Sequence, residues 1–252
     1  MSPDNDDKTD FGFEKVSFQE KTKRVAEVFH SVANHYDLMN DMMSLGVHRL
    51  WKRLAIELAS VRPNDYILDL AAGTGDLSIK MASFLSETGK LFVTDVNESM
   101  LQIAKERMIT KGLINNAYFL QVNAEKIPFP DNTFDLVTIG FGLRNVSQKE
   151  TALKSIYQAL KPGGKLIILE FSKPTIPLLG KAYDLYSFKA LPLLGKFIAK
   201  DEASYRYLAE SIRMHPNQSK LLGMMEEAGF QNCSYHNLTG GNVAIHRGYK
   251  ID

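Results

Sequence analysis

The chain has 252 residues, of which 44% are apolar and 23% charged, proportions that are ordinary for a globular domain in water. Its formal net charge is +1, which gives no strong field for attracting nucleic acid, so no nucleic-acid partner is expected. The single cysteine, Cys233, cannot form an intramolecular disulfide and fits a reducing compartment, and no apolar run reaches the roughly 20 residues that span a bilayer.

The N-terminal part divides into a polar segment and a helical one. The first ten residues contain four Asp and one Lys, a composition unlike that of a secretory signal or an Arg-rich transit peptide. We therefore predict a cytoplasmic protein with disorder over 1–10 and helices within 11–60. Apolar residues recur there at helical spacing, first Val25, Val28, Phe29 and Val32, then Leu50, Leu54 and Leu58.

Strands and helices alternate through the middle of the chain. Short apolar runs predict strands at 66–70, 90–95, 117–122, 134–139 and 165–170. Periodic stretches predict helices at 76–85, 98–110 and 149–160, the last of them closed by the turn Lys161-Pro162-Gly163-Gly164. Repeated strand-then-helix order is typical of a doubly wound α/β domain with a parallel sheet and right-handed crossovers.

The C-terminal part begins with an interruption of this alternation. Residues 173–216 are rich in Leu, Tyr and Pro, and we expect a helical insertion there. A helix at 221–228 and two strands at 231–238 and 242–249 follow, and Gly240-Gly241 between the strands indicates a hairpin. The whole chain, 1–252, is thus predicted to be a single domain whose sheet has seven strands.

The most informative segment is the loop after the first strand of this sheet, LDLAAGTGD at 68–76. Open α/β sheets bind ligands at this place. In this chain, Gly73 and Gly75 would let the backbone approach a ligand, and the following helix would present free amides to it. A dinucleotide fingerprint would require a third glycine, where this chain has Ser78, and the carboxylates of Asp69 and Asp76 would oppose a pyrophosphate. The same charges suit an ammonium and a sulfonium, so the pattern favours S-adenosylmethionine.

Two further positions indicate a nucleoside without deciding which one. Asp95 ends the second strand, about 20 residues past the glycines, where an acid accepts hydrogen bonds from ribose hydroxyls. The alternative is that Asp95 only caps the next helix. Asn123 and Ala124 follow the third strand, where adenine would lie, although Asn123 could instead cap a turn.

The loop after the fourth strand, Gly140-Phe141-Gly142-Leu143-Arg144-Asn145, faces the same crevice. A planar cation and an amide in a loop at the carboxyl edge of a sheet suggest substrate handling. The alternative is a surface arginine on a glycine-rich turn.

With these segments in place, the chain resembles the ubiquinone/menaquinone biosynthesis C-methyltransferase family from Phe11 to Tyr249. The motifs are YDLMNDMMS (36–44), HRLWK (48–52), FGLRNV (141–146), LKPGG (160–164), LEFS (169–172) and SYRYLAESI (204–212). The first and third of these runs are the most specific, whereas the glycine loop and LKPGG are general to methyltransferases.

The resemblance implies a fold, a cofactor and a reaction. The fold is the class I, Rossmann-like methyltransferase sheet with strand order 3-2-1-4-5-7-6 and an antiparallel last strand, and the cofactor is S-adenosyl-L-methionine. The reaction is C-methylation of reduced polyprenyl quinones, which converts demethylmenaquinol to menaquinol and methylates 2-methoxy-6-polyprenyl-1,4-benzoquinol. An NAD-dependent oxidoreductase and a non-catalytic partner protein that binds S-adenosylmethionine stay as alternatives.

The family's donor-binding positions carry over to this chain as Thr74, Asp95, Asn123, Ala124 and Gly140. Relatives often have Ser at the last of these positions, and glycine has no hydroxyl, so a contact there must be made by the backbone. Ala72 stands where close relatives usually have Gly, a change that is tolerated if its φ is negative.

The acceptor must be the reduced quinol, because deprotonating its hydroxyl pushes electron density onto the ring carbon. We expect Arg144 to orient or activate that hydroxyl through water and to stabilise the phenolate, since arginine is a poor base. Asn145 would hold Arg144 in place. Tyr36 would close the acceptor pocket, unless it is an ordinary core aromatic.

The expected partners follow from the substrate. The apolar residues of 174–200 either belong to the core or receive the polyprenyl tail at a membrane surface, with Lys173, Lys181, Lys189, Lys196 and Lys200 near lipid phosphates. A transient membrane contact and a homodimer are both compatible with the sequence. The six histidines lack metal-ligand spacing, so no metal is expected.

Overall fold

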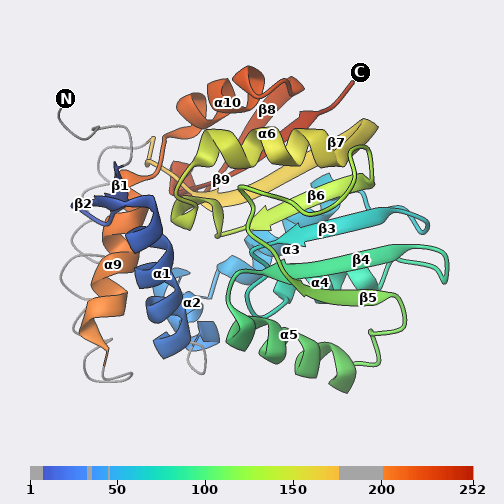
Figure 1. Ribbon diagram of the computed structural model, residues 1–252, viewed down its shortest axis with the longest axis horizontal. Helices are drawn as coiled ribbons and strands as arrows, with labels where there is room; N and C mark the ends of the chain where they lie inside the picture. The colour runs from blue at the N-terminus through green and yellow to red at the C-terminus, as the bar shows by residue number, and fades with distance from the viewer. Residues whose placement is uncertain (1–7, 33–35, 45, 176–200, 252) are drawn as a thin grey trace.

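The computed structural model describes residues 8–32, 36–44, 46–175 and 201–251, and its centre is a seven-stranded sheet (Figure 1). The sheet has the order β5-β4-β3-β6-β7-β9-β8. Its strands are β3 (Tyr66–Leu70), β4 (Lys90–Asp95), β5 (Ala117–Gln121), β6 (Phe134–Gly140), β7 (Leu160–Phe171), β8 (Gln231–Leu238) and β9 (Val243–Tyr249). The first five pair in parallel, and β9 is antiparallel to both of its neighbours, so the predicted strand order is confirmed.

Two hydrophobic cores cover the two faces of the sheet. Helices α3 (His48–Ala59), α4 (Asp76–Ala82) and α5 (Glu98–Thr110) pack on one face, and α6 (Lys149–Ala159) and α10 (Gln218–Glu227) on the other. Successive residues of strand β3 alternate between the cores, with Ile67 in the first and Leu68 in the second, and neither is exposed. Strand β3 therefore contributes side chains to both cores.

A second group of elements lies beyond the carboxyl ends of the parallel strands, at the left of Figure 1. It consists of the hairpin of β1 (Lys8–Phe11) and β2 (Glu14–Ser17) with helices α1 (Phe18–Val32), α2 (Tyr36–Ser44) and α9 (Glu202–Met214). The rings of Phe11 and Tyr207 stack with centroids 4.2 Å apart and tie the hairpin to α9. The prediction of disorder over 1–10 is therefore wrong for residues 8–10, because cross-strand hydrogen bonds order them, and residues 1–7 lie outside the described part.

The structure also refines the predictions for the LKPGG turn and for the insertion at 173–216. The LKPGG turn does end α6, but it lies within β7, where a register shift separates the Phe134–Leu160 pair from the Leu136–Lys165 pair. Within the predicted insertion at 173–216, α9 is helical as expected, whereas 176–200 lies outside the described residues.

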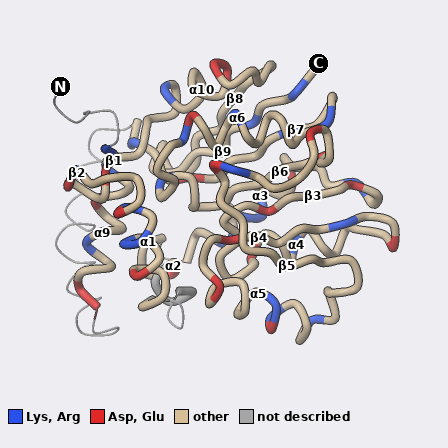
Figure 2. Tube along the Cα trace, viewed as in Figure 1, with Lys and Arg blue, Asp and Glu red and all other residues tan. Residues whose placement is uncertain are grey.

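The surface has no dominant charge, and acidic and basic positions are interspersed along the trace in Figure 2. In the part of the chain that the structure describes, no helix is both long and apolar enough to cross a bilayer.

The buried face of α3 differs from the apolar stripe that its sequence suggests. Leu50 is 52% exposed, and Leu54 and Leu58 pack only at the margin of the core. The buried side chains are His48, Trp51, Lys52, Ala55, Ile56 and Ala59. One polar member of this face, Lys52, lines a cavity with residues of the loop that follows β3.

We expect Ile56→Ala to lower the free energy of unfolding by about 2–5 kcal/mol, since it opens a cavity against the sheet. Leu50→Ala, on the same helix, should change it by less than about 0.5 kcal/mol. Urea denaturation of both variants measures the difference, and equal losses would contradict the observed orientation of α3.

Candidate functional site

The glycine loop between β3 and α4 is held in an unusual backbone conformation. Ala71, Gly73 and Gly75 have φ values of 51°, 56° and 80°, in the left-handed region that favours glycine. Ala72 is outside that region, so the backbone condition for accepting alanine at this position is met. Gly75 also needs to be small, because a Cβ there would lie 3.0 Å from the Cβ of Ala104 on α5.

Asp95, at the end of β4, joins the glycine loop to the start of α5. Its Oδ2 accepts a hydrogen bond of 2.9 Å from the backbone N–H of Gly73, and its Oδ1 accepts one of 2.9 Å from that of Asn97. Asn97 is the residue that caps α5, because its side chain accepts from the backbone N–H of Met100. The alternative role of Asp95 as the helix cap is therefore excluded.

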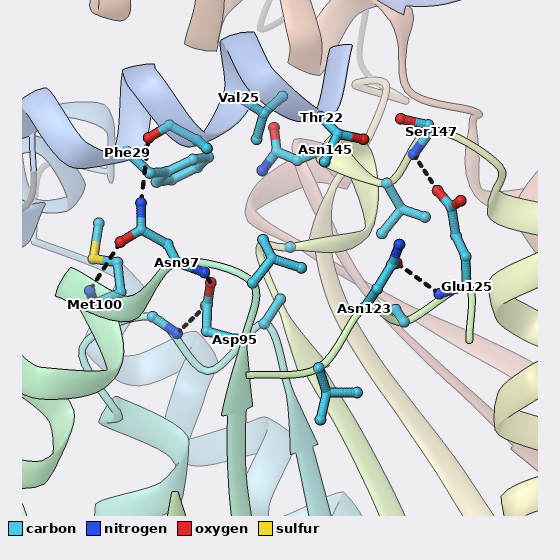
Figure 3. Close-up of a pocket in the computed structure, with 18 of the residues that line it drawn as sticks. Thr22, Val25, Phe29, Asp95, Asn97, Met100, Asn123, Glu125, Asn145 and Ser147 are labelled. Carbon is cyan, nitrogen blue, oxygen red and sulfur yellow. Dashed lines mark hydrogen bonds between the residues drawn. The ribbon is translucent and has the colours of Figure 1, made fainter. Parts of the chain in front are cut away.

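These loops form one wall of a pocket at the carboxyl edge of the sheet (Figure 3). The predicted residues on its wall are Gly73, Asp95, Asn123, Ala124 and Asn145. Its ionisable lining residues are Asp95 and Glu125, and among the described residues no Lys or Arg lines it. The pocket thus suits a ligand whose buried part is neutral or positively charged.

Asn123 caps a turn and also lies on the pocket wall. Its Oδ1 accepts a hydrogen bond of 2.9 Å from the backbone N–H of Glu125, which caps a turn. This bond leaves the amide nitrogen on the pocket wall, where it can donate to a ligand (Figure 3).

Helix α1 covers the pocket, which the sequence did not predict. Thr22, Val25, Ala26 and Phe29 line it, and Asn97 donates from Nδ2 to the carbonyl of Ala26 at 3.2 Å. The helical spacing of Val25 and Phe29 was a correct signal for a buried face. It did not indicate that this face looks into a pocket.

The two loop carboxylates do not carry the free charge that the sequence argument gave them. Asp69 is fully buried and accepts hydrogen bonds from Ser78 Oγ at 2.5 Å and Thr138 Oγ1 at 2.7 Å. Burial raises its pKa to about 6. Ser78, at the place of the missing third glycine, thus serves to hold Asp69 under the loop.

Asp76 is already neutralised by two cations. Its Oδ2 lies 2.5 Å from Lys52 Nζ, and its Oδ1 lies 2.8 Å from Arg107 Nη2. Burial acts to raise the pKa of Asp76, but the two ion pairs prevail and lower it to about 2. The prediction that the charge of Asp76 suits a ligand's ammonium group is therefore wrong, because Asp76 is already paired with Lys52 and Arg107.

A smaller cavity lies beside the glycine loop, on the side of α3. Asp69, Thr74 and Gly140 line it, together with Lys52, Ala71, Ala72, Asp76 and Leu77. Arg107 donates from Nη1 to the carbonyl of Thr74 at 2.8 Å and so fixes this end of the loop. The predicted cofactor positions are therefore divided between two adjacent cavities, with Gly75 supporting the loop between them.

Arg144 is neither a surface residue nor part of the larger pocket's wall. It is 4% exposed, and its Nη1 donates to Glu170 Oε1 at 2.9 Å and to the carbonyl of Phe141. Its backbone N–H also donates to Glu170, at 3.1 Å. This buried pair fixes the loop that follows β6. The sequence gave no signal for this role of Glu170 beyond its place in the LEFS motif.

Asn145, the next residue, does line the pocket. Its Oδ1 accepts a hydrogen bond of 3.0 Å from the hydroxyl of Tyr207 on α9. The amide nitrogen of Asn145 is therefore the group left to donate into the pocket. Tyr36 begins α2, but its side chain lies outside the described part, so its role stays a prediction.

Comparison with known proteins gives consistent matches over the full chain. Residues 17–250 match the family described as the ubiE/COQ5 methyltransferase family. The ubiquinone/menaquinone biosynthesis C-methyltransferase UbiE of Cronobacter sakazakii is 56% identical over 251 residues, 100% of both chains. The UbiE of Ectopseudomonas mendocina is 59% identical over 242 residues, 96% of this chain and 94% of the relative.

Solved structures agree on the fold. A SAM-dependent methyltransferase from Aquifex aeolicus superposes with a TM-score of 0.63 at 19% identity, over 85% of this chain and 97% of its own. Haemonchus contortus phosphoethanolamine N-methyltransferase 2, in complex with S-adenosyl-L-methionine, superposes with a TM-score of 0.60 at 16% identity, over 80% of this chain and 52% of its own.

The raised pKa of Asp69 predicts a pH dependence of stability. Between its unfolded value near 4 and its folded value of about 6, the folded state binds more protons than the unfolded state. Wild-type stability should therefore fall with rising pH across this window, relative to Asp69→Asn, whose amide does not titrate. Urea unfolding from pH 4 to 7 measures the difference, and parallel curves for the two proteins would contradict it.

Proposed function

Because the chain belongs to the ubiE/COQ5 methyltransferase family, we propose that its methyl acceptors are reduced polyprenyl quinones, demethylmenaquinol and 2-methoxy-6-polyprenyl-1,4-benzoquinol. The protein is an S-adenosylmethionine-dependent C-methyltransferase of ubiquinone and menaquinone biosynthesis. Both alternatives, the NAD-dependent oxidoreductase and the non-catalytic binding protein, are thereby excluded. The finer assignments below are proposals.

The charge of the larger pocket supports a sulfonium donor. Its lining carries carboxylates and, among the described residues, no cation. Asp95 would accept hydrogen bonds from the ribose hydroxyls, Asn123 and Ala124 would contact adenine, and Thr74 and Gly140 would contact the amino-acid end. When bound, S-adenosylmethionine supplies an electrophilic methyl group and its own leaving group, so this chain need only bind and orient the acceptor.

The protein's chemical task is then to favour the deprotonated quinol and hold its ring. Positioning of this kind can contribute about 7–11 kcal/mol to lowering the barrier. Asn145 would donate its amide N–H to the quinol oxygen, while Tyr207 holds that amide in orientation. The observation that carries this step is the hydrogen bond between these two residues.

Arg144 would supply positive charge near the same oxygen. Its guanidinium is buried with Glu170, so a contact with substrate would run through water rather than directly. Its Nε is buried and has no hydrogen-bond partner within the described residues, which leaves one donor for such a water. Tyr36 would close the acceptor pocket from α2.

A cytoplasmic location, a contact with the membrane surface and a homodimer stay predictions. Lys173 is exposed, but the apolar segment 176–200 that would meet the bilayer lies outside the described residues.

The acceptor's oxidation state provides the test of this function. Transfer of a labelled methyl group should occur with a reduced demethylmenaquinol analogue and fail with the oxidised quinone, because the quinone ring is electrophilic. Equal transfer to both forms would refute the proposed acceptor chemistry.

The role of Asn145 can be separated from donor binding. We expect Asn145→Leu to lower kcat by about 10²–10³-fold, the loss typical of removing one preorganised donor to a developing oxyanion. Tyr207→Phe keeps the amide but loses its orientation, so its loss should be smaller. Affinity for S-adenosylhomocysteine serves as the control and should be unchanged in both; normal kcat in Asn145→Leu would remove this residue from the mechanism.

A further inference from the structure

The charge of the larger pocket leaves one part of the methyl donor without a partner. The donor's amino-acid end carries a carboxylate, and buried carboxylates need a cation or several hydrogen-bond donors. The larger pocket offers carboxylates of its own, Asp95 and Glu125, and no cation among the described residues. A cation for the donor's carboxylate must therefore come from outside the lining of this pocket.

The smaller cavity beside the glycine loop has a single cationic lining residue in the described part of the chain, Lys52. Thr74 and Gly140, which we place at the donor's amino-acid end, line the same cavity. Ala71 lines both cavities, so the two adjoin at the glycine loop. A ligand that lies across this loop can reach Lys52 with one end and Asp95 with the other.

The surroundings of Lys52 fix its ammonium group without using all of its donors. The side chain is 7% exposed and belongs to the buried face of α3. Trp51, its neighbour, donates from Nε1 to Thr239 Oγ1 at 2.9 Å and holds the helix in place. An ammonium has three N–H donors, and among the described residues Lys52 makes one hydrogen bond, to Asp76.

Both carboxylates that line the smaller cavity already have partners, Asp69 in Ser78 and Thr138 and Asp76 in two cations. Lys52 and Arg107 share the single carboxylate of Asp76. Arg107 lines only the outer hollow on this side of α3, whereas Lys52 and Asp76 line both that hollow and the smaller cavity. A ligand carboxylate in that cavity could accept from the remaining N–H donors of Lys52, which Asp76 would orient toward it.

We propose that Lys52 binds the α-carboxylate of the methyl donor and that the smaller cavity is the subsite for the donor's amino-acid part. This inference rests on the proposed placement of the donor's ribose at Asp95. It assigns to α3 a role in donor affinity in addition to its packing against the sheet.

Calorimetric titration with two ligands tests the assignment. S-adenosylhomocysteine has the carboxylate, and its decarboxylated analogue lacks it. Wild-type protein should bind the first about 10–100-fold more tightly, the range expected for a hydrogen bond to a charged group. Lys52→Met should weaken S-adenosylhomocysteine binding by a similar factor and leave the affinity for the analogue unchanged, whereas Lys52→Arg should retain most of the preference.

Two control variants separate the role of Lys52 from the proposed placement of the donor's ribose at Asp95. Arg53→Met removes a neighbouring cation of the outer surface of α3 and should change neither affinity. Asp95→Asn should weaken both ligands equally; if it weakens neither, the placement of the ribose is wrong, whatever Lys52 does.

Three outcomes overturn the role of Lys52. They are equal affinity of wild-type protein for the two ligands, unchanged binding of S-adenosylhomocysteine by Lys52→Met, and an equal loss of both ligands in that variant. If Lys52→Met fails to fold, the wild-type comparison and Lys52→Gln decide the question by the same criteria.

Discussion

The bidentate bonding of Asp95 is the interaction on which the proposed donor site depends. One carboxylate oxygen accepts from Gly73 in the glycine loop and the other from Asn97 at the start of α5. The two loops belong to adjacent parallel strands, so the bonds fix the crevice at the point where such sheets bind ligands. Because the left-handed backbone at Ala71 is unfavourable on its own, the loop keeps its shape only while these contacts hold it.

Buried charges support this arrangement from inside the fold. Asp76 holds Lys52 and Arg107 on one side of the glycine loop, and Glu170 holds Arg144 under the loop after β6. Replacing such pairs with apolar residues often costs little stability, so pairing alone does not account for their presence. Each pair here places an arginine or lysine next to a loop that lines a cavity. A role in positioning that loop or a ligand would explain the buried charges, whereas a contribution to stability would not.

The elements outside the sheet determine what the site can exclude and accept. Helix α1 covers the donor pocket, and α9, almost two hundred residues further along the chain, orients Asn145 through Tyr207. Methyltransferases that share the sheet with only 16–19% identity show the fold alone. The covering helices are thus the part of the structure that, in the proposed function, would contact the acceptor.

The sequence by itself determined the order of the elements, the seven-stranded sheet and the loops that line the pocket, because strand and helix periods and glycine positions are local properties of the chain. Only the tertiary structure decided which charges face a ligand. Asp76 and Lys52 are 24 residues apart, Arg144 and Glu170 are 26 apart, and Asn145 and Tyr207 are 62 apart. Whether a carboxylate is free or paired depends on what the fold brings within about 3 Å of it, and no local pattern records that distance.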